Sequence, residues 1–294
     1  MIITRLIGGL GNQMFQYAVG RTLSFKWHTD LYLDICLLNN PPPNITPRYF
    51  ELNTFNIKAS IAPTDILKQV PLSRKDKLRT GFHSIFNRES IFQCVNEQTI
   101  DFDNRIPDLP DNIYLNGYWQ SEKYFADIPD VIREDFTILP PPSKSNQEML
   151  DKIQECNAVS IHIRRGDYLT NPETRRTHFV CDEDYYFRAI EIIMQQIEKP
   201  HFFVFSDDAT WARNHIIPDA PVVYISHNTG KKSYEDLRLM MHCKHHVIAN
   251  SSFSWWGAWL GKKEGQIVLV PGKWFNTKHC NYDDRVPKNW LVMK

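Results

Sequence analysis

The chain has 294 residues, 42% of them hydrophobic, and carries 34 basic and 34 acidic side chains. This content supplies a sizeable core for two compact domains or one large one and argues against a disordered chain. The balanced charge excludes a global electrostatic field that would recruit nucleic acid or an anionic membrane, so any anion-binding capacity must be local. The six cysteines are scattered without a C-x-x-C motif, which indicates free thiols in a reducing compartment.

The apolar segments are too short or too interrupted to cross a membrane. Residues Ile2 to Ile7 form a short run broken by Arg5, which is typical of a strand rather than a signal peptide. The richest late stretch, Val247 to Leu260, contains Asn250 and several serines and falls short of the ~20 apolar residues of a span. We expect a soluble cytoplasmic protein, at most peripheral to the inner membrane.

Short apolar runs alternate with helical patterns along most of the chain, which predicts βαβ units around parallel sheets and an α/β fold. Helices are expected over Asn12 to Ser24 and around Tyr186 to Ile197, where apolar residues share one face. The strands are expected at Ile2 to Ile7, Leu31 to Ile35, Ala158 to Ile163, His201 to Phe205, Val222 to Ile225, His246 to Asn250 and Ile267 to Val270.

A proline-led polar run, Leu139 to Asn146, is interpreted as an interdomain linker because neither a helix nor a central strand accepts it. It divides the chain into residues 1–139 and 147–294. The middle of the first part, about Asn39 to Asp111, is expected to be irregular. We predict two Rossmann-like domains that face a cleft.

The glycine string Gly8-Gly9-Leu10-Gly11 follows the first strand and precedes the polar pair Asn12-Gln13. Such a turn lets a ligand approach the backbone N–H groups of a helix N-terminus. The dinucleotide fingerprint requires glycine where Met14 stands, so a nicotinamide or flavin site is weakly supported. The alternative is a tight turn without a ligand.

The segment His162 to Tyr168 ends a predicted strand with two arginines, a glycine and an aspartate. Arginine matches phosphate oxygens with a rigid fork of donors, so one of the pair is a candidate diphosphate clamp. Strand alternation puts His162 and Arg164 opposite Ile163, with Arg165 directed toward Asp167 or the surface. The alternative is a structural Arg–Asp pair that closes a loop.

Two further strands end in polar residues where ligands bind to parallel sheets. Ser206 and Asp207 are candidates for nucleotide contact, whereas Asp208 suits a helix cap. In the second motif, hydroxyls and the N–H groups of a new helix converge, as at an anion site, or else serve only as caps. That motif runs from Asn250 through Ser251, Ser252 and Phe253 to Trp255, Trp256 and Gly257.

Other strings suggest metal binding but are weak. Asp101 to Asp103 and Asp182 to Asp184 both read D-x-D, a pattern that can hold a divalent metal on a nucleotide diphosphate and is also common by chance. The group His242, Cys243, His245 and His246 fits no standard zinc spacing. We therefore expect no metal site.

Taken together, the motifs resemble those of glycosyltransferase family 11, the α-1,2-fucosyltransferases that include the blood-group H-type enzymes, and the chain looks like a bacterial member. The resemblance spans nearly the whole chain in order. It rests on Gly8 to Ala18, His162 to Tyr168, Phe205 to Asp208 and Asn250 to Leu260.

The resemblance implies a GT-B-type fold, GDP-fucose as the donor bound mainly by the second domain, and inversion without a required metal. It implies that Arg164 clamps the β-phosphate, that His162 lies near the guanine or the phosphate, and that Asp236 pairs with guanine. By the same resemblance, the phosphates would meet Ser251, Ser252 and Phe253, while the fucose and diphosphate would be covered by Gly11, Asn12 and Gln13.

The expected reaction moves L-fucose to the 2-hydroxyl of a β-galactoside glycan. Arg164 and the helix N-terminus near Ser252 would stabilise the charge that grows on the diphosphate. If a general base exists, Asp167 and Glu173 are the candidates. The alternatives are another GDP-sugar transferase, a metal-dependent D-x-D enzyme, and a non-catalytic glycan- or nucleotide-binding module.

Overall fold

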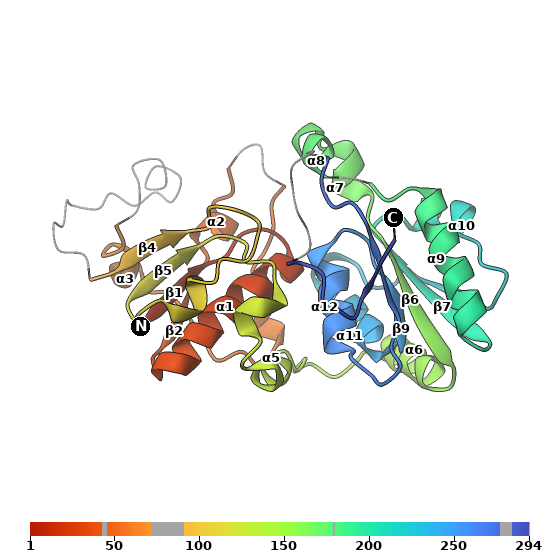
Figure 1. The fold of residues 1–294 in the computed structure, drawn as a ribbon, viewed down its shortest axis with the longest axis horizontal. Coiled ribbons are helices and arrows are strands. Elements are labelled where there is room, and N and C mark those ends of the chain that lie inside the picture. Colours follow the sequence, from red (N-terminus) through yellow and green to blue (C-terminus); the bar gives the residue numbers. More distant parts are fainter. Residues whose placement is uncertain (43–45, 72–90, 179, 277–283, 294) are drawn as a thin grey trace. The chain divides into compact units, whose positions relative to one another are not determined.

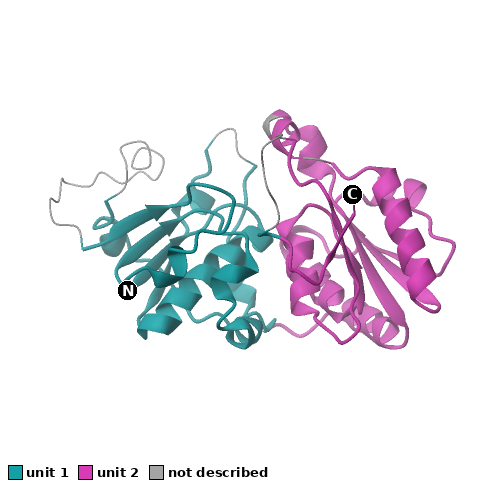
Figure 2. Cartoon of the chain, in the orientation of Figure 1, with its two compact units in different colours: residues 1–139, 283–285 teal, residues 140–282, 286–294 magenta. Residues whose placement is uncertain are grey.

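The computed structural model describes all residues except 43–45, 72–90, 179, 277–283 and 294, and it does not describe the side chain of Glu173. The chain divides into two compact units, which Figure 2 colours separately. Unit 1 comprises Met1–Leu139 with Asp283–Arg285, and unit 2 comprises Pro140–Tyr282 with Val286–Lys294.

Unit 1 is built on a five-stranded sheet of order β3-β2-β1-β5-β4, in which every pairing is parallel (Figure 1). The central strands are buried and largely apolar, although β1 ends in the buried Arg5, whereas the edge strand β3 is exposed. The strands are β1 Ile2–Arg5, β2 Leu31–Asp34, β3 Ser60–Ile61, β4 Gln93–Asn96 and β5 Ile113–Asn116.

The main helix of unit 1 is α1, Leu10–Trp27, which begins after Gly9 and ends where His28 adopts a left-handed conformation with φ 50°. Gly20 sits where a Cβ would collide with Thr4 of β1, so its missing side chain allows α1 to pack close to the sheet. The other helical elements are α2 Cys36–Asn39, η1 Leu52–Thr54, α3 Thr64–Leu67, η2 Ile106–Asp108, η3 Glu122–Phe125 and α5 Pro129–Asp135.

Unit 2 is built on a six-stranded sheet of order β11-β10-β9-β6-β7-β8, again parallel throughout. The chain order reverses between β6 and β9, and such a switch point is where open α/β sheets bind ligands. The strands are β6 Asn157–Ile163, β7 Pro200–Ser206, β8 Val222–Ile225, β9 His245–Val247, β10 Val268–Pro271 and β11 Leu291–Met293.

Helices cover both faces of this sheet. Val159, Ile161 and Ile163 pack with α9 and α10 in one cluster, and Ala158 packs with α6 and α11 in another. Figure 1 shows these helices on opposite sides of β6, β7 and β9. The helical elements are α6 Lys144–Gln154, α7 Gly166–Thr170, α8 Pro172–Thr177, α9 Glu183–Gln196, α10 Ala209–His215, η4 Gly230–Lys232, α11 Ser233–His242 and α12 Ser252–Leu260.

The predicted α/β fold with parallel sheets is confirmed, but two local predictions are wrong. The polar run at 139–146 is not linker throughout, because Ser143 caps α6, which begins at Lys144. The middle region, about 39–111, is not wholly irregular, because it contains β3, α3 and β4.

Candidate active site

Three neighbouring parallel strands of unit 2 deliver polar residues to one edge of the sheet. In the register of β6 and β7, His162 lies opposite Phe205 and Ile163 opposite Ser206. The residues that follow these two strands, Arg164 after β6 and Asp207 after β7, therefore meet just beyond the edge of the sheet. Because β9 is also parallel to β6, Asn250 follows at the same edge.

Arg164 is held by carboxylates on two sides. Its Nη2 lies 2.6 Å from Oδ1 of Asp167 and its Nη1 lies 2.7 Å from Oδ2 of Asp207. Burial lowers the pKa of the guanidinium, but the two carboxylates outweigh this and raise it, so Arg164 stays charged. The guanidinium also lies 5.4 Å from the ring centroid of Tyr168.

Arg165 points elsewhere. Its guanidinium lies 3.8 Å from the ring centroid of Trp211, and its Nε lies 3.6 Å from Asp208. Only its backbone N–H joins the site, donating to Asp207 at 2.8 Å. Of the two predicted directions, toward Asp167 or the surface, the first is wrong because Arg164 occupies the Asp167 carboxylate, and Trp211 offers Arg165 an aromatic face instead.

His162 is buried on the α12 side of the sheet, opposite Ile163 as strand alternation predicts. Its Nδ1 is hydrogen-bonded to Oγ of Ser254 at 2.9 Å, and its ring centroid lies 5.6 Å from that of Phe253. Oγ of Ser254 also lies 3.3 Å from the carbonyl oxygen of Ser251, so Ser254 connects His162 to the residue that precedes α12. Burial lowers the pKa of His162 to about 4, with a counteracting effect of Asp207, so the ring is neutral near pH 7.

Tyrosines on the helices satisfy the carbonyls at the strand ends. Tyr168 donates to the carbonyl of Asn250 at 3.2 Å, Tyr185 to Ile248 at 2.6 Å and Tyr186 to His162 at 3.1 Å. These bonds fix the backbone that presents Arg164 and the start of α12. The sequence did not predict these roles of the tyrosines, nor the hydrogen bond of Ser254. Tyr168 and Ser254 do lie within the segments His162 to Tyr168 and Asn250 to Leu260.

The residues before and at the start of α12 are arranged as a helix cap. The Ser251 side chain accepts the N–H of Phe253 at 3.3 Å, and Ser252 begins the helix. Asn250 is buried and donates to the carbonyl of Trp274 at 2.8 Å, so its amide faces the interior. The predicted cap is present, and the side chain of Asn250 positions the turn rather than facing outward.

Asp236 lies on α11 and accepts a hydrogen bond from Nδ2 of Asn228 at 2.8 Å. Burial raises the pKa of its carboxyl to about 7, although the bond from Asn228 lowers it. A half-buried carboxyl that is hydrogen-bonded to an amide rather than to a cation is suited to accept further N–H donors.

Ser206 and Asp208 form hydrogen bonds within their own turn, and the side chain of Glu173 cannot be placed. Ser206 accepts the N–H of Asp208 at 3.0 Å, and Asp208 caps α10 by accepting the N–H of Trp211 at 3.1 Å. Glu173 falls in α8, but its side chain lies outside the described residues.

In unit 1 the glycine turn is tight, with Gly8 at φ 80°. Gln13 is buried, donates to the carbonyls of Gly8 and Tyr49, and accepts the N–H of Glu51, so its polar atoms are used within unit 1. The hydrogen bonds of Gln13 therefore connect the segment around residue 50 to α1. Asn12 is half-buried and accepts a bond from Gln120 at 2.7 Å, and the neighbouring Gly11 is buried.

The D-x-D strings have other partners. Asp103 forms a two-pronged ion pair with Arg105, and Asp182 caps α9. Within the described part of the chain, no group of three or more His, Cys, Asp or Glu side chains is placed to hold a metal ion. No described helix combines the length and apolarity needed to cross a membrane.

The fold has a counterpart among solved structures. A point mutant of Arabidopsis thaliana FUT1 in complex with GDP matches 92% of this chain and 69% of its own, with a TM-score of 0.52 at 12% identity. The two parallel α/β units and this likeness define a fold of the GT-B class of glycosyltransferases.

The family is shown by sequence. The model of glycosyl transferase family 11 matches residues 55–294. An Escherichia coli α-1,2-colitosyltransferase is 34% identical over 99% of this chain and 98% of its own length. The E. coli O-antigen biosynthesis glycosyltransferase WbnK is 35% identical over 92% of this chain and 93% of its own. The chain belongs to glycosyl transferase family 11, and it is an enzyme of the α-1,2-fucosyltransferase family.

Proposed function

We propose that the enzyme transfers L-fucose from GDP-fucose to the 2-hydroxyl of a β-galactoside glycan, with inversion and without a required metal. The observation that carries the proposal is the fixed guanidinium of Arg164 at the switch-point edge of unit 2, in a chain of this family. Residues 147–294 would bind GDP, and residues 1–139 would form the acceptor side.

In this proposal Arg164 clamps the diphosphate. A guanidinium has five N–H donors, and Asp167 and Asp207 use one each. The remaining donors are available to phosphate oxygens, and the two carboxylates fix the orientation in advance. Preorganised donors of this kind stabilise the negative charge that grows on the leaving diphosphate as the bond to fucose C1 breaks.

The N-terminus of α12 would supply a second set of donors. The backbone N–H groups after Ser251 carry the positive end of the helix dipole, which favours an anion. His162 supports this turn through Ser254, and its neutral ring adds no charge. Ser252 and Phe253 would then lie beside the phosphates, and Gly11 and Asn12 of unit 1 would contact the fucose and diphosphate.

The galactose 2-hydroxyl would attack as the diphosphate leaves, through an oxocarbenium-like state in which a general base is optional. Asp167 is a poor base because its carboxylate holds Arg164. Glu173 stays a candidate for this role.

The sugar of the donor has a second candidate. The relative that matches 99% of this chain is named for colitose rather than fucose. Colitose transfer is therefore the alternative activity, with the same linkage and the same nucleotide site.

The decisive experiment offers GDP-fucose and GDP-colitose separately to a panel of galactosides, with and without excess chelator, and determines the linkage of each product. We expect α-1,2-fucosylated galactosides in both conditions. Arg164→Ala should lose turnover by several orders of magnitude while keeping the wild-type circular dichroism spectrum. Near-normal GDP release by this variant would refute the clamp, and activity abolished by chelator would refute metal independence.

A further inference from the structure

Asp236 of α11 is oriented by a pair of amides that come from two other elements of unit 2. Asn146 of α6 and Asn228 of the loop after β8 form a reciprocal pair: Nδ2 of Asn146 donates to Oδ1 of Asn228 at 2.9 Å, and Nδ2 of Asn228 donates back to Oδ1 of Asn146 at 3.0 Å. The second N–H of Asn228 is left to donate to Oδ1 of Asp236 at 2.8 Å.

The pair of Asn146 and Asn228 is itself held in place by further hydrogen bonds to Asn146. Asn146 is 1% exposed, its Nδ2 donates to Oγ of Ser143 at 3.0 Å, and its Oδ1 accepts from Nε2 of His227 at 2.8 Å. If the Asn228 amide were reversed, its oxygen would face the carboxylate of Asp236 and both bonds to Asn146 would be lost. The orientation of Asn228 is therefore determined by its neighbours.

The consequence is that one oxygen of Asp236 is fixed and the other remains open to a ligand. Oδ1 accepts the bond from Asn228, and no further bond to Asp236 occurs within the described residues. A fixed carboxylate with a free acceptor oxygen matches a base that presents adjacent N–H donors along one edge, as guanine does with N1 and N2.

We propose that Asn228, held by Asn146, is a positioning residue that sets the selectivity of the enzyme for the guanine base of its donor. This rests on the proposed function, in which Asp236 pairs with guanine. Guanine would be selected over hypoxanthine, which lacks the N2 amine, because the carboxylate is held at the angle at which both N–H donors reach it.

The charged groups around Asp236 support a direct test by pH. On α11 itself, Glu235 is paired with Arg238 at 2.8 Å, and α12 carries no charged side chain. The charged side chains of the other elements packed against α11 are exposed, and so is His227 of the preceding loop; they are Lys144, Glu148, Asp151 and Lys152 of α6 and Lys231 and Lys232 of η4.

The experiment measures binding of GDP and IDP by calorimetry to the wild type, Asn228→Ala, Asn146→Ala, Asp236→Asn and the exposed control Asn214→Ala. We expect Asn228→Ala to lower GDP affinity about tenfold, the factor carried by ~1.4 kcal/mol. The variant should lower the affinity for IDP less, so the ratio of the GDP affinity to the IDP affinity becomes smaller. Asn146→Ala should act in the same direction, and Asn214→Ala should change neither value.

A pH series separates positioning from general damage. GDP binding should tighten as pH rises through about 7, where the Asp236 carboxyl ionises. Asn228→Ala should move this step to higher pH, because the lost donor had stabilised the carboxylate. Asp236→Asn should lack the step and thereby report the protonation of the diphosphate alone.

The outcomes are distinguishable. An unchanged GDP-to-IDP ratio in a folded Asn228→Ala variant, with GDP binding lost in Asp236→Asn, would refute the positioning role and leave the nucleotide site standing. Wild-type GDP binding by Asp236→Asn would refute the proposed guanine site itself. Equal losses for GDP and IDP without a shift of the pH step would reduce Asn228 to a structural role and overturn the inference.

Discussion

Gly166 leaves the space that Asp207 occupies. A Cβ at Gly166 would lie 2.7 Å from Oδ2 of Asp207, the oxygen that holds Nη1 of Arg164. The other oxygen of Asp207 accepts the N–H of Arg165. The glycine of the arginine motif thus lets a carboxylate from the next strand reach both residues of the turn, and its role here is this close approach rather than an unusual backbone angle.

Gly166→Ala should therefore weaken GDP binding about tenfold or more by displacing Asp207 from Arg164, since a bond to a charged group contributes ~1.5–3 kcal/mol. Asp207→Asn should reproduce part of the loss, because it keeps an oxygen for Arg165 but removes the charge that holds Arg164. Calorimetry with GDP measures both.

The control for this pair is Asn214→Ala, an exposed position on α10. It should bind GDP as the wild type does. Wild-type affinity in a folded Gly166→Ala variant would show that the contact between Asp207 and Arg164 is not required.

The two adjacent arginines should differ sharply in effect. Arg165→Ala removes a stacking contact with Trp211, worth ~0.5–2 kcal/mol of stability for a side chain that is 19% exposed, and should change turnover and GDP affinity by less than about threefold. Arg164→Ala should abolish turnover. Parallel steady-state kinetics check this, and an Arg165 variant as inactive as the Arg164 variant would contradict the assignment.

Most of the strands that were missed differ physically from those that were predicted. Strands β6 and β7 lie inside the sheet with helices on both faces, so they are long, largely apolar runs that can be recognised in the sequence. The missed strands β3, β4 and β11 are short edge strands with exposed residues, and their position is fixed by pairing with a neighbour, which a local pattern does not contain. Strand β5 was also missed although it is buried inside the sheet of unit 1, because its apolar run is limited to Ile113, Tyr114 and Leu115.

The site was predictable to the extent that it follows from strand ends. Parallel strands bring Arg164, Asp207 and Asn250 to one edge, as the sequence predicts. The choice of Arg164 over Arg165 as the partner of Asp167 was not predictable in this way, because strand alternation ends where α7 begins. The pair of Asn146 and Asn228 joins elements 82 residues apart, so no local spacing indicates it.

Stability should fall as the pH is lowered below about 6.5, because buried histidines must stay neutral in the folded protein. Burial lowers the pKa of His162 and His245 to about 4 and that of His246 to about 3. Between these values and the ordinary 6.5 the unfolded chain binds more protons, so the free energy of unfolding rises with pH by up to about 1.4 kcal/mol per unit for each ring.

Asp236 and Glu97 act in the opposite direction, since burial raises the pKa of each carboxyl and this favours the folded state at low pH, but three rings outweigh two carboxyls. Urea unfolding at pH 5 and pH 7 measures the slope. His246→Asn can keep a hydrogen bond to Ser160 but removes one titrating ring. It should therefore reduce the pH dependence of the free energy of unfolding by the contribution of about one proton. A free energy of unfolding that does not change between the two pH values would contradict the prediction.

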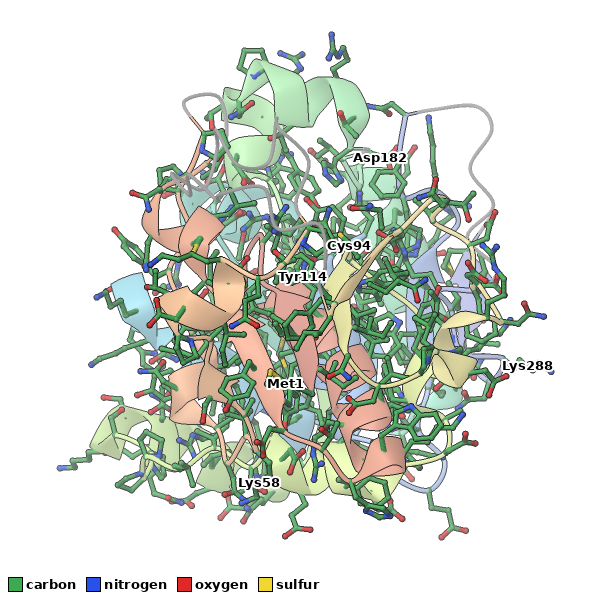
Figure 3. All side chains as sticks on the ribbon, turned by 90° about the vertical axis from the view of Figure 1, so that its left-hand side faces the viewer. Met1, Lys58, Cys94, Tyr114, Asp182 and Lys288 are labelled. Carbon is green, nitrogen blue, oxygen red and sulfur yellow. The ribbon has the colours of Figure 1, made fainter. Side chains whose placement is uncertain are left out.

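A buried charge cluster in unit 1 provides the last test. Tyr114, labelled in Figure 3, is fully buried; its hydroxyl donates to Oδ2 of Asp34 at 2.5 Å and accepts from Nε of Arg5 at 2.7 Å. Arg5 and Asp34 themselves lie 3.6 Å apart, 3% and 1% exposed. All three residues sit on adjacent parallel strands, so removal of the cation leaves a buried carboxylate without a counter-charge.

Arg5→Met should therefore lower the free energy of unfolding by about 3–5 kcal/mol, the usual result of breaking a buried pair from one side. Arg5→Met combined with Asp34→Leu should recover part of the loss, because no charge remains buried. Lys26→Met, which breaks the exposed pair with Asp108, is the matched control and should cost less than about 1 kcal/mol. Urea unfolding of the four proteins completes the comparison, and a loss in Arg5→Met no larger than that in Lys26→Met would mean that the cluster does not stabilise unit 1.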